Sequence, residues 1–146
     1  MLFRSILVPT DGSPGAARAL GQALSLRTQL REGQGIELHL VNVQRPVTGN
    51  VSSFVPAGSI EDYHKERSEK ALAPARKLLQ AAGLPFHEHR KVGEPGRGIA
   101  ESAVAEGCDL IVMGARGLGS YTGALLGSVA ASALEHATVP VLVVRG

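Results

Sequence analysis

The residues with the clearest capacity for chemistry lie between Met113 and Ser128, in the stretch MGARGLGSYTGALLGS. Glycine lets backbone N–H groups close around an anion without a side chain in the way. Arg116 adds a planar cation, and the helix expected from Ser128 onward directs the positive end of its dipole at the same place. The glycines are Gly114, Gly117, Gly119, Gly123 and Gly127, and hydroxyl donors come from Ser120, Thr122 and Ser128. This combination of groups predicts a phosphate-binding loop.

Two common phosphate-binding motifs do not fit this stretch. Gly114 and Gly119 have the spacing of a Walker A loop, but Ser120 stands where that motif needs lysine. A dinucleotide motif also fails, because its third glycine comes one residue late, at Gly123. The loop is nevertheless more than a flexible connection in this context, because residues 109–113 predict a buried strand and a strand, glycine loop and helix in succession commonly hold phosphate.

A different spacing, Gly114-x2-Gly117-x9-Gly127-Ser128, combines with the run Pro9-Thr10-Asp11-Gly12-Ser13 near the N-terminus. Together these motifs resemble the universal stress protein family, in particular its ATP-binding branch, and residues 139–144 resemble the last strand of that family. The resemblance extends from end to end of the chain. It implies a stress-response protein that binds ATP or AMP, with Mg²⁺ in the case of ATP.

The resemblance also implies which residues surround the nucleotide. Asp11 would accept hydrogen bonds from a base amino group or a ribose hydroxyl, although an aspartate at this position can equally help to cap the first helix. Val43 would line the adenine pocket, although a valine there is equally a core residue. Ribose and phosphates would lie against the glycine loop and the N–H groups of Gly127 and Ser128. The complete expected set is Pro9, Thr10, Asp11, Val43, Met113, Gly114, Arg116, Gly117, Gly127, Ser128 and Val129.

Short apolar runs alternate with helical patterns along the chain, which predicts an α/β fold with an open, doubly wound parallel sheet and helices on both faces. With 146 residues, we expect one domain, residues 1–146. The resemblance implies the strand order 3-2-1-4-5 of adenine nucleotide alpha hydrolase-like folds, with the site at the switch point between strands 1 and 4. The predicted strands are residues 5–8, 36–43, 86–92, 108–113 and 139–144.

Local signals predict where the helices begin and end. Ser13 and Pro14 start the first helix, which Gly33 or Gly35 stops. Ser59 begins the second helix, and Pro74 is expected to kink or break it. Residues 44–58 between these helical segments are predicted to be a long surface loop, either an ordinary one or a lid over the site.

Some reactive side chains are expected to be structural. His87 and His89 alternate along a predicted edge strand, and two histidines at this spacing can share a metal. Because the sequence places no further ligand beside them, we predict a solvated strand face and no metal site. Cys108, the single cysteine, excludes an internal disulfide and is expected to be a buried thiol.

The composition of the chain limits the classes of partner that we expect. The net charge of +2 is not clustered, and aromatic residues make up 3% of the chain, so no nucleic-acid platform is expected. No apolar run has the length of a signal peptide core or a membrane span, which predicts a cytoplasmic protein without membrane contact. Residues 141–144 form an apolar strand at the implied sheet edge, which favours a homodimer.

Three functions remain open from the sequence. The leading one is an adenine-nucleotide-binding regulator that hydrolyses ATP slowly if at all, because no general base or lysine accompanies the glycine loop. A second is an adenylyl-transfer or nucleotide-hydrolysing enzyme, for which the run Pro9-Thr10-Asp11-Gly12 lacks the expected histidines. The third is a nucleotide-independent interaction module, which needs several carboxylates and a lysine that the sequence does not bring together.

Overall fold

The computed structural model describes residues 3–30, 35–47, 57–117 and 125–146. Within these residues, five strands and four helices alternate, in agreement with the predicted α/β class. In chain order they are β1 (Ser5–Pro9), α1 (Pro14–Gln29), β2 (Glu37–Gln44), α3 (Ala57–Ala81), β3 (His87–Val92), α4 (Pro95–Ala105), β4 (Leu110–Gly114), α5 (Ser128–His136) and β5 (Val141–Val144).

The strands form one parallel sheet in the order β3-β2-β1-β4-β5, which confirms the implied order. From β1 the chain passes through α1 to β2, and from β4 it passes through α5 to β5 on the other side. The connections that follow these two central strands therefore leave in opposite directions. Ligands of such sheets bind beyond the carboxyl ends of the strands at this switch point.

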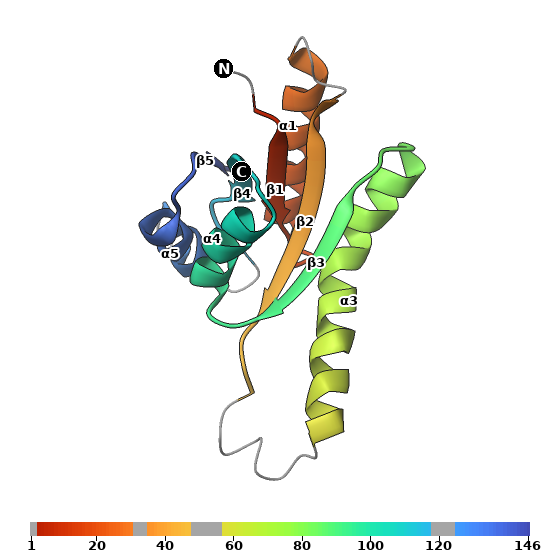
Figure 1. Ribbon diagram of the computed structural model, residues 1–146, viewed down its shortest axis with the longest axis vertical. Helices are drawn as coiled ribbons and strands as arrows, with labels where there is room; N and C mark the ends of the chain where they lie inside the picture. The colour runs from red at the N-terminus through yellow and green to blue at the C-terminus, as the bar shows by residue number, and fades with distance from the viewer. Residues whose placement is uncertain (1–2, 31–34, 48–56, 118–124) are drawn as a thin grey trace.

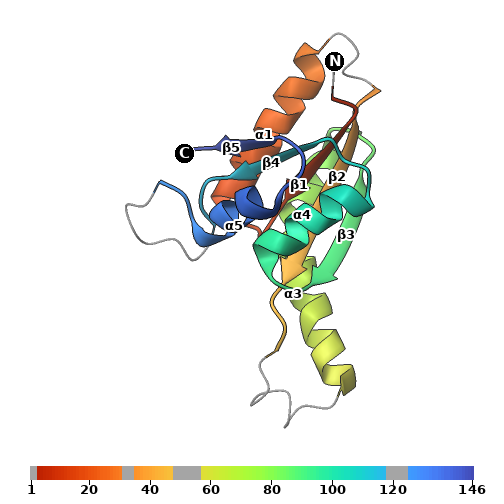
Figure 2. The same ribbon diagram turned by 60° about the vertical axis from the view of Figure 1, so that its left-hand side comes forward.

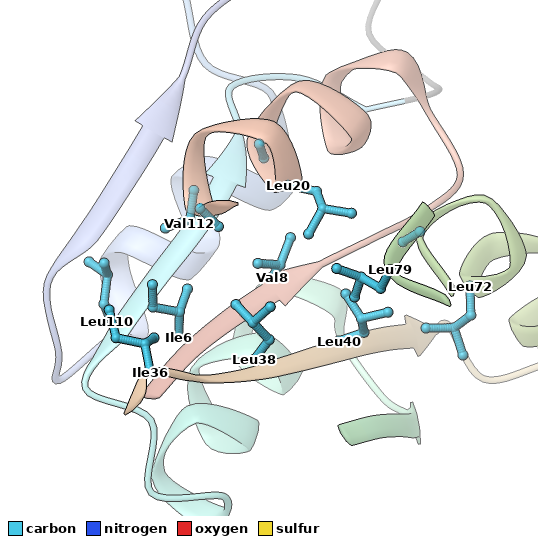
Figure 3. Close-up of a cluster of buried hydrophobic side chains, with 13 residues drawn as sticks. Ile6, Val8, Leu20, Ile36, Leu38, Leu40, Leu72, Leu79, Leu110 and Val112 are labelled. Atoms are coloured by element: carbon cyan, nitrogen blue, oxygen red, sulfur yellow. The ribbon is translucent and has the colours of Figure 1, made fainter. Parts of the chain in front are cut away.

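Two helices cover each face of the sheet: α1 and α3 lie on one face, and α4 and α5 on the other (Figures 1 and 2). Strand residues alternate between the two cores, so Ile6 and Val8 pack under α1 and α3 while Leu7 packs under α4 and α5. Leu20 of α1 and Leu79 of α3 lie over the first of these cores (Figure 3). Apolar residues on both faces explain why the central strands β1 and β4 are continuous apolar runs.

Helix α1 begins as predicted, because the Ser13 hydroxyl accepts from the N–H of Ala16 at 3.1 Å and Pro14 occupies the first turn. It ends at Gln29, earlier than the expected stop at Gly33, which lies outside the described residues, or at Gly35. The C-cap Leu30 already has an extended backbone, so the helix needs no glycine to end it.

Helix α3 departs from the expectations in two ways. It begins at Ala57, two residues before Ser59, and it continues through Pro74 to Ala81 as one element. The expected break at Pro74 is therefore wrong. Proline removes one hydrogen bond from the helix, but Pro74 lies on the exposed side, and the buried Leu72 and Leu79 hold both halves against the sheet. Burying two leucine side chains contributes about 3–6 kcal/mol, which offsets the roughly 3 kcal/mol cost of an interior proline.

The edge strand β3 alternates as predicted. Glu88 faces α3, where its carboxylate lies 2.8 Å from Arg76 Nε, and Lys91 faces α4, where its Nζ lies 3.0 Å from Glu101 Oε1. Within the described residues no helix is both long and apolar enough to cross a membrane, since α3 has 25 residues but is highly charged over its first half.

Candidate functional site

A cavity of about 1060 Å³ opens at the carboxyl ends of β1, β2 and β4, at the switch point of the sheet. Its volume lies just above the roughly 300–1,000 Å³ that is typical of small-molecule sites. All eleven residues that the sequence analysis expected around a nucleotide line this cavity: Pro9, Thr10, Asp11, Val43, Met113, Gly114, Arg116, Gly117, Gly127, Ser128 and Val129. Segments about a hundred residues apart in sequence thus meet around one space.

The turn after β1 is held by its own side chains. The N–H of Ser13 donates to Asp11 Oδ1 at 2.9 Å, and the N–H of Gly12 donates to Thr10 Oγ1 at 3.3 Å. Because Ser13 is the N-cap of α1, Asp11 supports the turn before the helix rather than capping it. The Thr10 hydroxyl in turn donates to the carbonyl of Ala71 at 3.2 Å and joins this turn to α3. The turn is therefore fixed in place at the cavity wall.

Glycines let the loops after β1 and β4 cross at close range. A Cβ on Gly15 would lie 2.7 Å from the carbonyl oxygen of Arg116, and a Cβ on Gly114 would lie 3.0 Å from the carbonyl of Gly15. A Cβ on Gly117 would collide with the carboxylate of Asp11. These three glycines therefore serve close approach of backbone and side chain, while the left-handed backbone of this region belongs to Gly12, with φ +82°.

The N-terminus of α5 opens on the cavity. Gly127 is its N-cap, and no side chain among the described residues caps the helix. We expected the Gly127 N–H to face an anion, but in this structure it donates to the carbonyl of Ala115 at 2.7 Å. The first-turn donors that a ligand could use are thus the N–H groups of Ser128, Val129 and Ala130. Ser120 and Thr122, also expected to supply hydroxyl donors, lie outside the described residues, as do residues 48–56 of the expected lid.

Helix α3 supplies lining residues that the sequence analysis missed. Its first turns extend beyond the carboxyl ends of β1 and β2 (Figure 1), and one helical face places Tyr63, Arg67 and Lys70 at the cavity. The guanidinium carbon of Arg67 lies 5.6 Å from the centre of the Tyr63 ring, and its Nε donates to Gln44 Oε1 at 3.2 Å. With Arg45 and Arg116, these residues bring four cations to the lining. Their spacing of three and four residues marks one helical face, but nothing in the sequence aims that face at the site.

The end of β2 provides a polar anchor and an apolar wall. Buried Asn42 donates to the carbonyl of Thr10 at 2.8 Å and accepts from Gln44 Nε2 at 2.7 Å. Val43 packs against α4, where a Cβ on Gly98 would come within 2.7 Å of a Val43 methyl. With Ile99 and Met113, Val43 gives the cavity apolar surface beside its cationic side.

Comparison with known proteins identifies the family of this chain. Residues 2–145 match the Universal stress protein family. The chain belongs to this family. Universal stress protein MJ0531 of Methanocaldococcus jannaschii is 33% identical over 148 residues, which cover 99% of this chain and 83% of the relative.

Solved members of the universal stress protein family share the fold. The structure of the hypothetical protein MJ0577, from the same archaeon, matches with a TM-score of 0.82 at 28% identity and covers 100% of this chain and 98% of its own. A universal stress protein solved in complex with cAMP matches with a TM-score of 0.70 at 25% identity, covering 99% of this chain and 98% of its own. Some relatives of this chain therefore bind nucleotides.

Proposed function

We propose that this universal stress protein, as one domain, binds an adenine nucleotide, ATP or AMP, in the cavity at the switch point. The observation that carries the proposal is the N-terminus of α5, which no side chain among the described residues caps and which opens on a cavity lined by four cations. A helix N-terminus and basic side chains both favour phosphate. The cAMP complex of a relative supports adenine as the base.

Each part of the nucleotide has a suitable surface. The phosphates would accept from the N–H groups of Ser128 and Val129 and lie near Arg116, with the cations of α3 beside any further phosphates. The base would pack on Val43, with Thr10 and Asp11 within the same wall. Pro9, Met113, Gly114 and Gly117 would shape the floor through their backbone.

Mg²⁺ would enter with ATP rather than as a resident ion. Asp11 is the one carboxylate among the described lining residues, and one of its oxygens already accepts from the N–H of Ser13. Mg²⁺ is often held by one or two carboxylates together with substrate phosphates. The residues present thus fit an ion that the triphosphate itself brings in.

The site favours a regulator over a fast catalyst. Asp11 is the one carboxylate that could act as a base among the described lining residues, and it is engaged in the turn after β1. Phosphoryl transfer needs a positioned nucleophile in addition to charge neutralisation. We expect ATP hydrolysis well below the ordinary enzyme range of about 1–10³ per second, and a role in the stress response through nucleotide occupancy.

A matched pair of variants at Ser128 tests the phosphate contact. Ser128 is the first residue of α5, where proline is well tolerated, and Gly127 before it has the φ −73° and ψ 167° that a residue before proline prefers. Ser128→Pro removes one N–H and keeps the helix, whereas Ser128→Ala keeps the N–H. A hydrogen bond to a charged group contributes about 1.5–3 kcal/mol, so Ser128→Pro should bind AMP about 10- to 100-fold more weakly.

Calorimetric titration of AMP, ATP and GTP into the wild type and both variants gives the answer. The Ser128→Ala protein should bind AMP within a few-fold of wild type, because it loses only the hydroxyl. The wild type must first be shown to carry no nucleotide from purification. If it then binds none of the three nucleotides, the proposal fails and the nucleotide-independent interaction module becomes the leading hypothesis. Equal AMP affinity in Ser128→Pro and wild type would indicate that the phosphates do not contact the N-terminus of α5.

We also propose that two copies associate through β5. Val141–Val144 forms the edge of the sheet beyond β4, and Leu142 on it is 39% exposed. An apolar edge strand offers unpaired backbone groups to a second copy. Sedimentation should show a species of twice the 15.2 kDa chain mass at micromolar concentration, and Leu142→Lys should shift it toward the monomer.

A further inference from the structure

Three of the five histidines of the chain gather on β2 and β3, on the face that α4 covers. His39 is the register partner of His87, and His89 follows two residues later on the same face. The His39 ring stacks on both neighbours, with ring centres 4.6 Å from His87 and 5.1 Å from His89. His39 Nδ1 and His89 Nε2 lie 2.9 Å apart.

Two carboxylates complete the group. Glu106, the C-cap residue of α4, places Oε2 3.8 Å from His89 Nδ1, and Glu37 at the start of β2 places Oε1 3.2 Å from His87 Nε2. We call these five residues the histidine cluster. It contains two sets of three ligand atoms, each within 4.8 Å of one another: His39, His89 and Glu106 form the inner set, and Glu37, His39 and His87 form the outer set.

We propose that the inner set, His39, His89 and Glu106, binds a divalent transition-metal ion such as Zn²⁺. Two imidazoles and one carboxylate form a known catalytic-type zinc ligand set, in which a water or another ligand takes the fourth position. Imidazole also favours Zn²⁺, Ni²⁺ or Cu²⁺ over Mg²⁺ and Ca²⁺, which prefer oxygen.

The distances suit one ion. Two nitrogens bound to the same Zn²⁺ at about 2.0–2.1 Å and a tetrahedral angle lie about 3.3 Å apart, so His39 Nδ1 and His89 Nε2 need to separate by only a few tenths of an ångström. The carboxylate of Glu106 lies beside the other ring nitrogen of His89, Nδ1, so its side chain has to rotate to reach an ion held by His39 Nδ1 and His89 Nε2. Cations are also favoured near the C-terminal end of a helix, where Glu106 lies.

Burial distinguishes the inner set from the outer one. His39 is 6% exposed, and the side chains of His89 and Glu106 are 24% and 37% exposed. In the outer set, His87 and Glu37 are 57% and 62% exposed, so bulk water competes more strongly for an ion there. The inner set is therefore the better-shielded site.

The histidine cluster is separate from the nucleotide cavity, because none of its five residues lines that cavity. The sequence analysis expected a solvated face at His87 and His89, because no further ligand could be placed beside them. The structure brings Glu37, His39 and Glu106 close to these two histidines. The missing ligands came from the register of β2 beside β3 and from the end of α4, which sequence spacing does not reveal.

Zinc titration of the full chain without a histidine tag tests the proposal. After metal removal, Zn²⁺ is titrated in competition with a chromogenic chelator, and the wild type should take up one equivalent. His39→Gln, His89→Gln and Glu106→Gln should each weaken binding at least about ten-fold, because even residues that merely support a ligand contribute 10–100-fold. Co²⁺ provides a second readout, since its visible spectrum changes when imidazole enters the coordination sphere.

Two further histidine variants serve as controls. His136→Gln removes a histidine at the end of α5, outside the cluster, and His87→Gln removes the outer neighbour of His39; both should keep the wild-type affinity within a few-fold. If His39→Gln does not fold, the exposed Glu106 and the edge-strand His89 still carry the test. Equal loss in His136→Gln would indicate adventitious binding, and loss confined to His87→Gln would place the ion in the outer set; either result overturns the proposal.

Discussion

The cavity and the histidine cluster are built in opposite ways on one sheet. Strand ends and the loops that follow them form much of the cavity, and glycines allow their backbones to come close together. The histidine cluster lies on regular strands, and its ligands are side chains brought together by strand register. Substitutions that add side-chain atoms should therefore damage the cavity, whereas substitutions that remove a ligand atom should damage the histidine cluster. Helix α4 joins the two, since Pro95 at its start lines the cavity and Glu106 at its end belongs to the cluster.

The largest expected effect is that one variant removes stabilisation by AMP alone and another removes stabilisation by Zn²⁺ alone. A ligand at a thousand times its dissociation constant adds about 4 kcal/mol to the free energy of unfolding, and each kcal/mol raises the melting temperature by roughly 2–4 °C. AMP and Zn²⁺ should each raise the melting temperature, and Ser128→Pro should reduce the AMP shift alone while His89→Gln reduces the Zn²⁺ shift alone.

With both ligands present, the two stabilisation free energies should add, because the cavity and the cluster share no residue. The measurement is a thermal melt with AMP, with one equivalent of Zn²⁺, and with both. Loss of the AMP shift in His89→Gln would show that the two regions are coupled, with α4 as the element that connects them. The interpretation of the cavity and the histidine cluster as two independent sites would then be wrong.

The next effect comes from adding one methyl group at the loop crossing. Gly15→Ala places a Cβ 2.7 Å from the carbonyl oxygen of Arg116, and neither backbone can move without shifting the cavity wall. Overpacking of this kind costs about 1–3 kcal/mol. Urea unfolding should show that loss, and AMP affinity should fall with it.

Gly21→Ala is the matched control, on the same helix as Gly15. A Cβ there meets nothing within 4 Å, and glycine costs a helix interior up to about 1 kcal/mol relative to alanine, so this variant should be more stable than the wild type. If both variants shifted stability in the same direction, close approach at Gly15 would not be what limits that position.

The two regions also differ in how far the sequence predicted them. Strand β1 begins at the predicted residue and β2 within one residue of it, because apolar runs and turn residues are local signals. Most of the residues expected at the cavity lie at or just after strand ends, and parallel strand ends meet at one edge, while Gly127, Ser128 and Val129 lie at the start of α5. Arg67 and Lys70 were missed because their place depends on how α3 is rotated against the sheet. His39 was missed because a pair of strands fifty residues apart had to be aligned residue by residue.

The smallest expected effect concerns Glu94, the N-cap of α4. Its carboxylate accepts from the N–H of Arg97 at 2.6 Å and of Gly96 at 3.2 Å, and from the hydroxyl of Ser132 of α5 at 3.2 Å. The hydrogen bond from Arg97, followed by those from Gly96 and Ser132, lowers the pKa of Glu94. The ionised form is therefore favoured in the folded protein, and its stabilising effect is complete above the unfolded pKa of about 4.3 and is lost as pH falls through the lower folded pKa.

Glu94→Gln should thus lower the free energy of unfolding at pH 7 by less than about 1 kcal/mol, at the weak end of N-cap effects, since the amide still accepts one hydrogen bond. Urea unfolding below pH 4, compared with pH 7, should show the gap between variant and wild type closing. Glu135→Gln, at an exposed position on α5, is the control for net charge. A gap that stays constant down to the acid limit would mean that packing at the α4–α5 contact, rather than the charge of Glu94, holds the start of α4 beside the cavity.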